Sequence, residues 1–172
     1  MKRKTKKVLV ILIISLFLIT TICVVVLKNT EIYQILIMKL GHYYREHGKP
    51  EKTEGMFKKV IEINPKNNQA YTWLGRFYRE QSRLEEAEDI LKMAIEIDPN
   101  NYDAYQLLIK TYIEQGKSED VEKIFVKTEE MLKNMMRTNP YIAYLNLGHF
   151  YQLRKEPEKT EEVLKKAIEI NS

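Results

Sequence analysis

The pattern of hydrophobic and polar positions divides this chain into two unlike parts. Residues 8–27 carry no charged side chain, and only Ser15, Thr20 and Thr21 interrupt their apolar run. From about residue 30 onward, apolar residues recur at helical spacing, and Gly and Pro punctuate the pattern at regular intervals. The sequence therefore predicts an apolar helix near the N-terminus, followed by an all-α body of amphipathic helices.

The apolar run is long enough to cross a membrane. Its 20 residues would form a helix about 30 Å long, which matches the hydrocarbon core of a bilayer. We expect residues 1–7 to be a basic tail and residues 8–28 to be a transmembrane signal-anchor helix. A cleaved signal peptide is an alternative, although the run exceeds the usual h-region and no Ala-x-Ala-like site follows it. Lipid attachment at Cys23 is another, although Ile22 stands where a small residue is usual.

The charge distribution separates the same two parts. The chain has 28 Lys and Arg against 24 Asp and Glu, but residues 1–28 hold six of the basic residues and no acid. The body is therefore slightly acidic, which disfavours nucleic-acid binding. Five basic residues precede the apolar run and three lie in the 20 residues after it. This bias predicts a single-pass protein of the cell membrane, with its N-terminus in the cytoplasm and its body outside. The single cysteine excludes an intramolecular disulfide.

The body contains a repeat with a 34-residue period. The same spacing of residues recurs in four units: Ile37, Leu40, Gly41 and Tyr44; Tyr71, Leu74, Gly75 and Tyr78; Tyr105, Leu108, Ile109 and Tyr112; Tyr144, Leu147, Gly148 and Tyr151. This signature resembles that of the tetratricopeptide repeat (TPR) family over about residues 31–172. The resemblance implies that residues 29–172 form a right-handed α-solenoid of about four helix pairs, in units near 34–67, 68–101, 102–140 and 141–172.

Glycines of the repeat predict local geometry. Those inside first helices cost about 1 kcal/mol relative to alanine, which indicates close approach of the paired second helix. They are Gly41, Gly75 and Gly148. Gly48 and Gly116 fall at turns and suit a left-handed helix cap. The third unit has Ile109 instead of the helical glycine, so we expect its helices to be spread slightly. Its second helix should be long, from Ser118 to about Arg137.

The resemblance implies a concave groove lined by the second, fifth, ninth, twelfth and thirteenth places of each unit. These places hold basic residues or histidines at His42, Arg45, Arg76, Arg79, Lys110 and His149. Apolar residues stand near the ends of the row, at Ile35, Met38 and Leu145, and acidic residues interleave at Glu46, Glu80, Asp103 and Glu114. We expect the groove to bind a protein or peptide partner with acidic groups. An anionic envelope polymer and a simple solvated helix face are the alternatives.

Both ends of the body have distinctive helices. The first helix is apolar around much of its circumference, at Ile32, Ile35, Leu36, Ile37, Met38 and Leu40, which predicts contact with the membrane surface or a partner. No solvating helix follows the fourth unit. Its last helix is either polar enough to act as a cap or contacts another molecule.

No residue pattern predicts catalysis, a cofactor or a metal site. His42 and His47 are five residues apart and do not share a helix face. The sequence contains no Gly-rich phosphate loop, nucleophile elbow or paired-carboxylate constellation. We therefore expect a non-enzymatic, membrane-anchored interaction module or scaffold that uses no cofactor. The alternatives are an assembly element that self-associates through its uncapped end and a non-catalytic subunit of an envelope-assembly complex.

Overall fold

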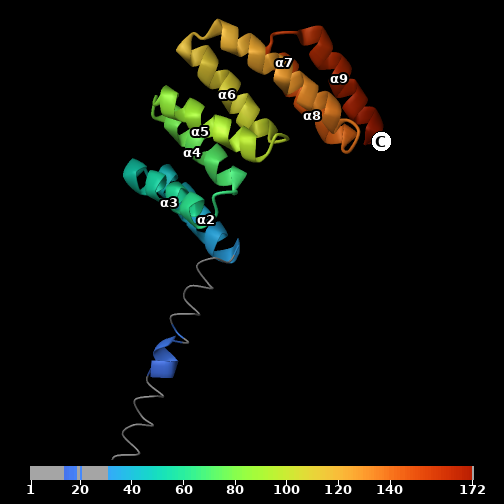
Figure 1. The fold of residues 1–172 in the computed structure, drawn as a ribbon. Helices are drawn as coiled ribbons and strands as arrows, with labels where there is room; N and C mark the ends of the chain where they lie inside the picture. The colour runs from blue at the N-terminus through green and yellow to red at the C-terminus, as the bar shows by residue number, and fades with distance from the viewer. Residues whose placement is uncertain (1–13, 19, 21–30, 172) are drawn as a thin grey trace, which may run out of the picture. The chain divides into compact units, whose positions relative to one another are not determined.

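The computed structural model describes residues 14–18, 20 and 31–171 (Figure 1). The basic tail and most of the expected transmembrane segment at residues 8–28 lie outside the described residues. Within the described ranges, no helix combines the length and apolarity that crossing a membrane requires.

The body consists of helices joined in pairs by short turns, so the predicted all-α repeat architecture is confirmed. The bounds of the helices are α2 (Glu31–Glu46), α3 (Pro50–Ile63), α4 (Asn68–Glu80), α5 (Leu84–Ile97), α6 (Tyr102–Gln115), α7 (Ser118–Met135), α8 (Pro140–Leu153) and α9 (Pro157–Ile170). Each pair combines a first helix with the second helix that follows it: α2 with α3, α4 with α5, α6 with α7, and α8 with α9.

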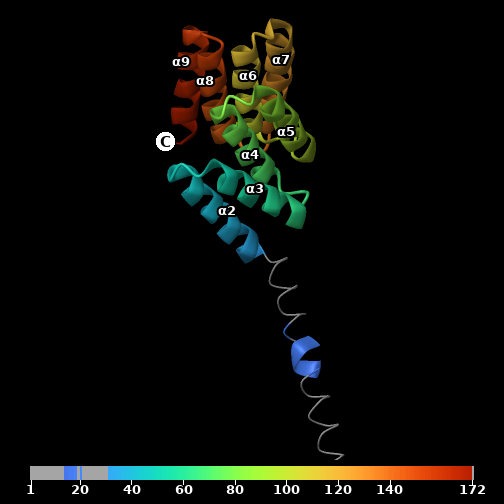
Figure 2. The ribbon, with the colours of Figure 1, turned by 90° about the vertical axis from the view of Figure 1, so that its left-hand side faces the viewer.

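These pairs fall into two compact units. The first unit contains α2 and α3 and ends at Pro65, and the second begins at Lys66 and contains α4 to α9. Within the second unit, α6 packs against α4 and α5, and α8 packs against α7. The three pairs of this unit therefore stack in chain order (Figures 1 and 2).

An asparagine cap starts each first helix of the second unit. The side-chain oxygens of Asn67, Asn101 and Asn139 accept hydrogen bonds from the backbone N–H groups three residues later, at 3.1, 3.1 and 3.2 Å. Such a cap satisfies a backbone donor that the helix itself leaves unpaired. The second helices α3 and α9 begin instead with Pro50 and Pro157, because the first turn needs no donor there.

The turn within each pair uses one left-handed residue. Gly48 and Gly116 have φ angles of 60° and 71°, which confirms the predicted left-handed caps. Ser82 and Lys155 occupy the equivalent places with φ angles of 58° and 60°, although neither is a glycine. In each pair, the backbone N–H that follows this residue donates to the carbonyl of the repeat tyrosine at 2.9–3.0 Å. The turn geometry is therefore kept where the sequence gives no glycine.

The helical glycines lie against the second helices, as their positions predict. A β-carbon on Gly75 would stand 2.6 Å from Leu91 Cγ, and one on Gly41 would stand 2.7 Å from Phe57 Cε1. A β-carbon on Gly148 would stand 2.6 Å from Leu164 Cδ2. In the third unit, the buried Ile109 replaces the glycine, and α6 packs less closely on α7 than the first helices of the other pairs do on their partners.

The repeat tyrosines of the second unit are buried packing residues, and each also has a cation near its ring. Tyr78, Tyr112 and Tyr151 are at most 9% exposed. Arg83 Cζ lies 4.2 Å from the ring centroid of Tyr78, and Lys159 Nζ lies 5.2 Å from that of Tyr151. Lys117 Nζ lies 5.8 Å from the centroid of Tyr112. A cation over an aromatic face contributes about 0.5–1 kcal/mol where the cation itself remains exposed to solvent, as it does here.

One carboxylate ties the second pair to the third. Glu88 on α5 accepts hydrogen bonds from Lys117 Nζ, at the start of α7, and from Lys92 Nζ, both at 2.6 Å. Partial burial raises the pKa of Glu88, but these hydrogen bonds more than offset that effect and lower the pKa to about 2. Glu88 therefore stays ionised at neutral pH and joins α5 to the turn between α6 and α7.

Candidate binding groove on the first-helix face

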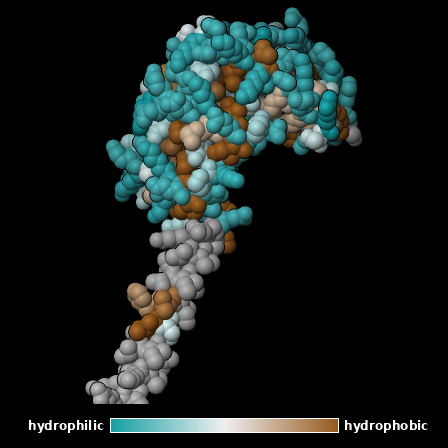
Figure 3. Space-filling view, viewed as in Figure 1, coloured by the Kyte–Doolittle hydropathy of each residue, from teal (hydrophilic) through white to brown (hydrophobic). Residues whose placement is uncertain are grey.

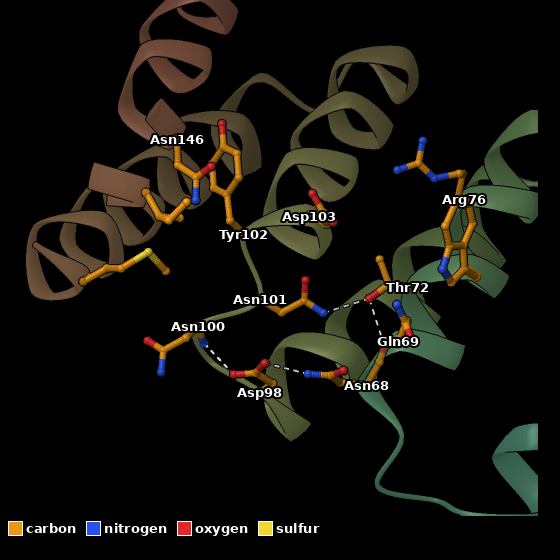
Figure 4. A pocket seen from close by; sticks show the side chains of 13 residues that line it. Asn68, Gln69, Thr72, Arg76, Asp98, Asn100, Asn101, Tyr102, Asp103 and Asn146 are labelled. Atoms are coloured by element: carbon orange, nitrogen blue, oxygen red, sulfur yellow. Dashed lines mark hydrogen bonds between the residues drawn. The ribbon is translucent and has the colours of Figure 1, made fainter. Parts of the chain in front are cut away.

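A pocket of about 560 Å³ opens in the second unit, between α4 and the starts of α6 and α8 (Figure 4). Several of its lining residues occupy the second, fifth or ninth places of their units, which are the places expected to face the groove. They are Gln69, Thr72, Arg76, Asp103 and Ile142. The loop between α5 and α6 and the end of α7 complete the wall. The structure therefore brings groove places from three successive first helices to one pocket.

One wall of the pocket is a hydrogen-bonded network between α4 and the loop that precedes α6 (Figure 4). Asn68 Nδ2 donates to Asp98 Oδ2 at 2.6 Å, and the Asn100 backbone N–H donates to Asp98 Oδ1 at 3.0 Å. Asn101 Nδ2 donates to Thr72 Oγ1 at 2.8 Å, and this hydroxyl donates to the Asn68 carbonyl oxygen at 2.9 Å. The other side-chain atom of this amide, Asn101 Oδ1, caps α6. The Asn101 side chain therefore joins this wall to the start of the helix.

Arg76 and Trp73 form a second part of the wall. The Arg76 guanidinium carbon lies 5.0 Å from the Trp73 ring centroid, so the cation covers the aromatic face. Among the described residues, Arg76 Nε is buried without a hydrogen-bond partner. The Tyr102 hydroxyl is also buried without a hydrogen bond of normal geometry to the described chain. Burial raises the pKa of Tyr102 above its usual range, so the phenol is neutral and retains its proton.

The pocket is polar, but it is not basic. Its charged lining residues are Arg76, Asp98 and Asp103, and its amides include Asn100 and Asn146. Asp98 already accepts two hydrogen bonds from its own wall. Side-chain amides both donate and accept, so they match the groups of a peptide main chain. Of the expected row of basic residues, Arg76 alone is among the residues that line this pocket.

The other predicted groove residues of the second unit lie outside the pocket. Arg79 Nη1 forms an ion pair with Glu114 Oε1 on α6 at 2.6 Å, so this positive charge is matched within the protein. Lys110 is half-buried and His149 is exposed. Leu145 lines a different pocket, at the C-terminal end of the unit, together with Tyr141.

The predicted groove residues of the first unit have varied surroundings. The His42 ring is half-buried and lies edge-on to Phe57, with 5.5 Å between ring centroids. Arg45 is half-buried, and Ile35 is 53% exposed. Met38 differs from the expectation of an accessible groove residue, because it is only 8% exposed. It belongs to the buried stripe of α2, with Gln34, Ile37 and Gly41 at helical spacing.

Sequence reasoning missed most of the polar residues of the pocket. Asn100 and Asn101 belong to a loop, and Asn146 occupies a place that does not belong to the expected groove. The available signal was the recurrence of asparagine pairs where first helices begin, at Asn67–Asn68 and Asn100–Asn101. Trp73, which is half-buried, also lines the pocket.

The stacked pairs and the pocket on their first-helix face define an α-solenoid with a binding groove. Three models described as tetratricopeptide repeat match residues 38–102, 80–128 and 141–172. Together they cover most of the body, so the chain belongs to the tetratricopeptide repeat family, whose members are protein–protein interaction modules. No curated protein sequence matches the chain at a significant level.

The chain is similar in fold to several solved structures. One is a thermophilic TPR protein of Thermus thermophilus, with TM-score 0.56 and 23% identity over 78% of this chain and 73% of that chain. A mutant of MamA has TM-score 0.51 and 26% identity over 58% of this chain and 72% of that chain. The first TPR of Spaghetti (RPAP3), bound to an HSP90 peptide, has TM-score 0.53 and 18% identity over 69% of this chain and 93% of that chain.

Proposed function

We propose that this chain is a membrane-anchored TPR module that binds an extended peptide segment of a partner protein along the first-helix face of its second unit. The observation that carries the proposal is the pocket that α4, α6 and α8 form from their groove places. The fold of the Spaghetti domain holds a peptide, and we extend only that mode of binding to this chain. The proposal assigns binding, not catalysis, to the pocket.

The charges of the pocket restrict the ligand. An acidic segment of the peptide should extend from Arg76 in the pocket toward Lys110, which lies outside the pocket and occupies the same place in the next unit. It should avoid Asp103, whose carboxylate is exposed at the pocket. The amides of Gln69, Asn100 and Asn146 would then hydrogen-bond the peptide main chain.

We predict that peptides selected for binding to the full-length chain lose affinity by about 10- to 100-fold when Arg76→Glu and Lys110→Glu are combined, because a charge-assisted contact is replaced by repulsion. The measurement is fluorescence anisotropy with peptides chosen from a displayed random library. Selected sequences should be rich in acidic residues, and their affinity should fall with added salt.

Two further variants make this test decisive. Val126→Glu adds a charge to α7 at a side chain that is 65% exposed and does not line the pocket, so it should leave affinity unchanged. Asp103→Lys changes an exposed pocket residue without touching the Arg76–Trp73 contact, and it should strengthen binding of acidic peptides. Equal affinities for all these variants would contradict binding in the groove.

We further propose that residues 8–28 anchor the chain as a single-pass membrane protein with its body outside the cytoplasm. Support comes from the uncharged run of residues 8–27 and from the excess of basic residues before it. The body would then present its groove to partners at the outer surface of the membrane.

The expected topology can be measured with fused reporters. A C-terminal alkaline phosphatase, which requires export, should be active, and a reporter that works only in the cytoplasm should be inactive. The full-length chain should stay in membranes after carbonate extraction, and deletion of residues 8–27 should release it. Activity of the cytoplasmic reporter alone would disprove the orientation, and a mature N-terminus beyond residue 27 would identify a cleaved signal peptide.

A further inference from the structure

The C-terminal end of the second unit carries an apolar groove between α8 and α9. It has a volume of about 320 Å³ and is lined by Tyr141, Leu145, Leu164, Ala167, Ile168 and Asn171. Leu164 is 36% exposed and Ile168 is 67% exposed. Charged side chains flank this groove on α9, where Lys165 Nζ forms an ion pair with Glu161 Oε1 at 2.6 Å. The end of the unit is therefore an apolar strip beside a polar helix face and is not a fully polar cap. On the face that Figure 3 shows, hydrophilic residues cover most of the second unit and hydrophobic residues gather in smaller patches between them.

The same surface occurs inside the second unit, where it is covered. Leu164 and Ile168 hold the repeat places that Leu91 and Ile95 hold on α5. Leu91 is fully buried and Ile95 is only 5% exposed, because α6 packs against α5. The interior of the unit thus shows which element covers such a surface. It is the first helix of a following pair.

The first helices that cover these surfaces use the third, seventh and tenth places of their units. In α6 these residues are Ala104, Leu108 and Thr111, and in α8 they are Ala143, Leu147 and Phe150. All six are at most 2% exposed. In α2, the same places hold Leu36, Leu40 and Tyr43, which are 58%, 41% and 49% exposed. Within the part of the chain that the structure describes, helix α2 therefore has an exposed apolar face at the places that α6 and α8 bury.

We propose that α2 of one copy of this chain packs into the α8–α9 groove of a second copy, so that the copies associate head to tail. Each copy supplies both halves of the contact, and both halves lie at the repeat places that already meet in the junctions of the second unit. Because the two surfaces differ, the interface is heterologous, and it extends into chains or rings of copies. This association does not depend on the peptide-binding function proposed above.

Sedimentation velocity of the purified full-length chain in detergent tests the contact. The wild-type chain should form species that grow with concentration. Ile168→Glu alone, and Leu36→Glu with Leu40→Glu, should each weaken association at least about ten-fold, because each places a charge in the centre of an apolar contact. The matched control is Val126→Glu, whose side chain on α7 is as exposed as Ile168 but lies outside the groove. None of these substitutions changes residues 8–27, so any association through that apolar segment would be equal in all the variants.

Mixing the two blocked variants gives the sharpest outcome. The Ile168→Glu chain keeps an intact α2 face, and the Leu36→Glu/Leu40→Glu chain keeps an intact α8–α9 groove. An equimolar mixture should therefore restore a complex that contains one copy of each and grows no further. The proposal is overturned if the mixture stays unassociated, if Ile168→Glu behaves like the control, or if the wild-type chain stays monomeric. A monomer whose α2 variants lose binding to lipid vesicles would assign that face to the membrane surface instead.

Discussion

Gly75→Ala is expected to lower the free energy of unfolding by about 1–3 kcal/mol, although alanine is the better helix former. The substitution gains about 1 kcal/mol of helix propensity. However, the new β-carbon would stand 2.6 Å from Leu91 Cγ and 2.7 Å from Leu91 Cδ2. Leu91 is fully buried and its Cγ is the branch point of the side chain, so α5 must move away from α4 to relieve the overlap.

Gly55→Ala provides the matched comparison for Gly75→Ala. Gly55 also lies inside a helix, α3, but a β-carbon there would meet no atom within 4 Å. We expect this substitution to raise the free energy of unfolding by about 0.5–1 kcal/mol through propensity alone. Urea unfolding of residues 31–172, followed by circular dichroism, measures both changes. If Gly75→Ala were as stabilising as Gly55→Ala, the close approach of α4 and α5 would be disproved.

Much of the fold could be predicted because each repeat encodes its own geometry. Glycines inside first helices predicted close helix pairs, and Gly48 and Gly116 predicted left-handed turns. Ser82 and Lys155 adopt that same backbone conformation without a sequence signal, since the packing on either side of each turn imposes it. Helix α7 ends at Met135, two residues before the expected end, which is within the usual uncertainty of a helix terminus.

The candidate site was predictable only in outline. The expected groove places include Arg76, which lines the pocket, because a family register fixes which side of a helix a residue occupies. That register does not show which charges are matched within the protein. Arg79 pairs with Glu114, which lies 35 residues further along the chain and therefore beside it in the next pair. The pocket amides come partly from the loop before α6, and a helical pattern carries no information about loop side chains. The register also does not show which groove places are buried. Met38 stands at such a place, but it belongs to the buried stripe of α2.

Phe150→Ala is expected to have the largest effect, lowering the free energy of unfolding by about 3–5 kcal/mol. Phe150 is fully buried on α8, and its ring meets Phe125 of α7 edge to face, with 5.5 Å between centroids. The Arg154 guanidinium carbon lies 4.8 Å from the Phe125 centroid and closes the cluster. This cluster joins the third and fourth pairs, where the repeat spacing lengthens to 39 residues. Truncation at Phe150 would leave a cavity that two stacked helix pairs cannot easily collapse.

Tyr43→Ala is the control for Phe150→Ala because it changes an aromatic residue at the same repeat place. Tyr43 is 49% exposed on α2, so its loss should change the free energy of unfolding by less than about 1 kcal/mol. Urea unfolding of the two variants measures the difference. Helix α8 also supplies Ile142 and Asn146 to the pocket. Phe150→Ala should therefore weaken peptide binding even at urea concentrations below its unfolding midpoint, whereas Tyr43→Ala should not. Similar stabilities for the two variants would show that α8 does not depend on the Phe125–Phe150 contact to hold its wall of the groove.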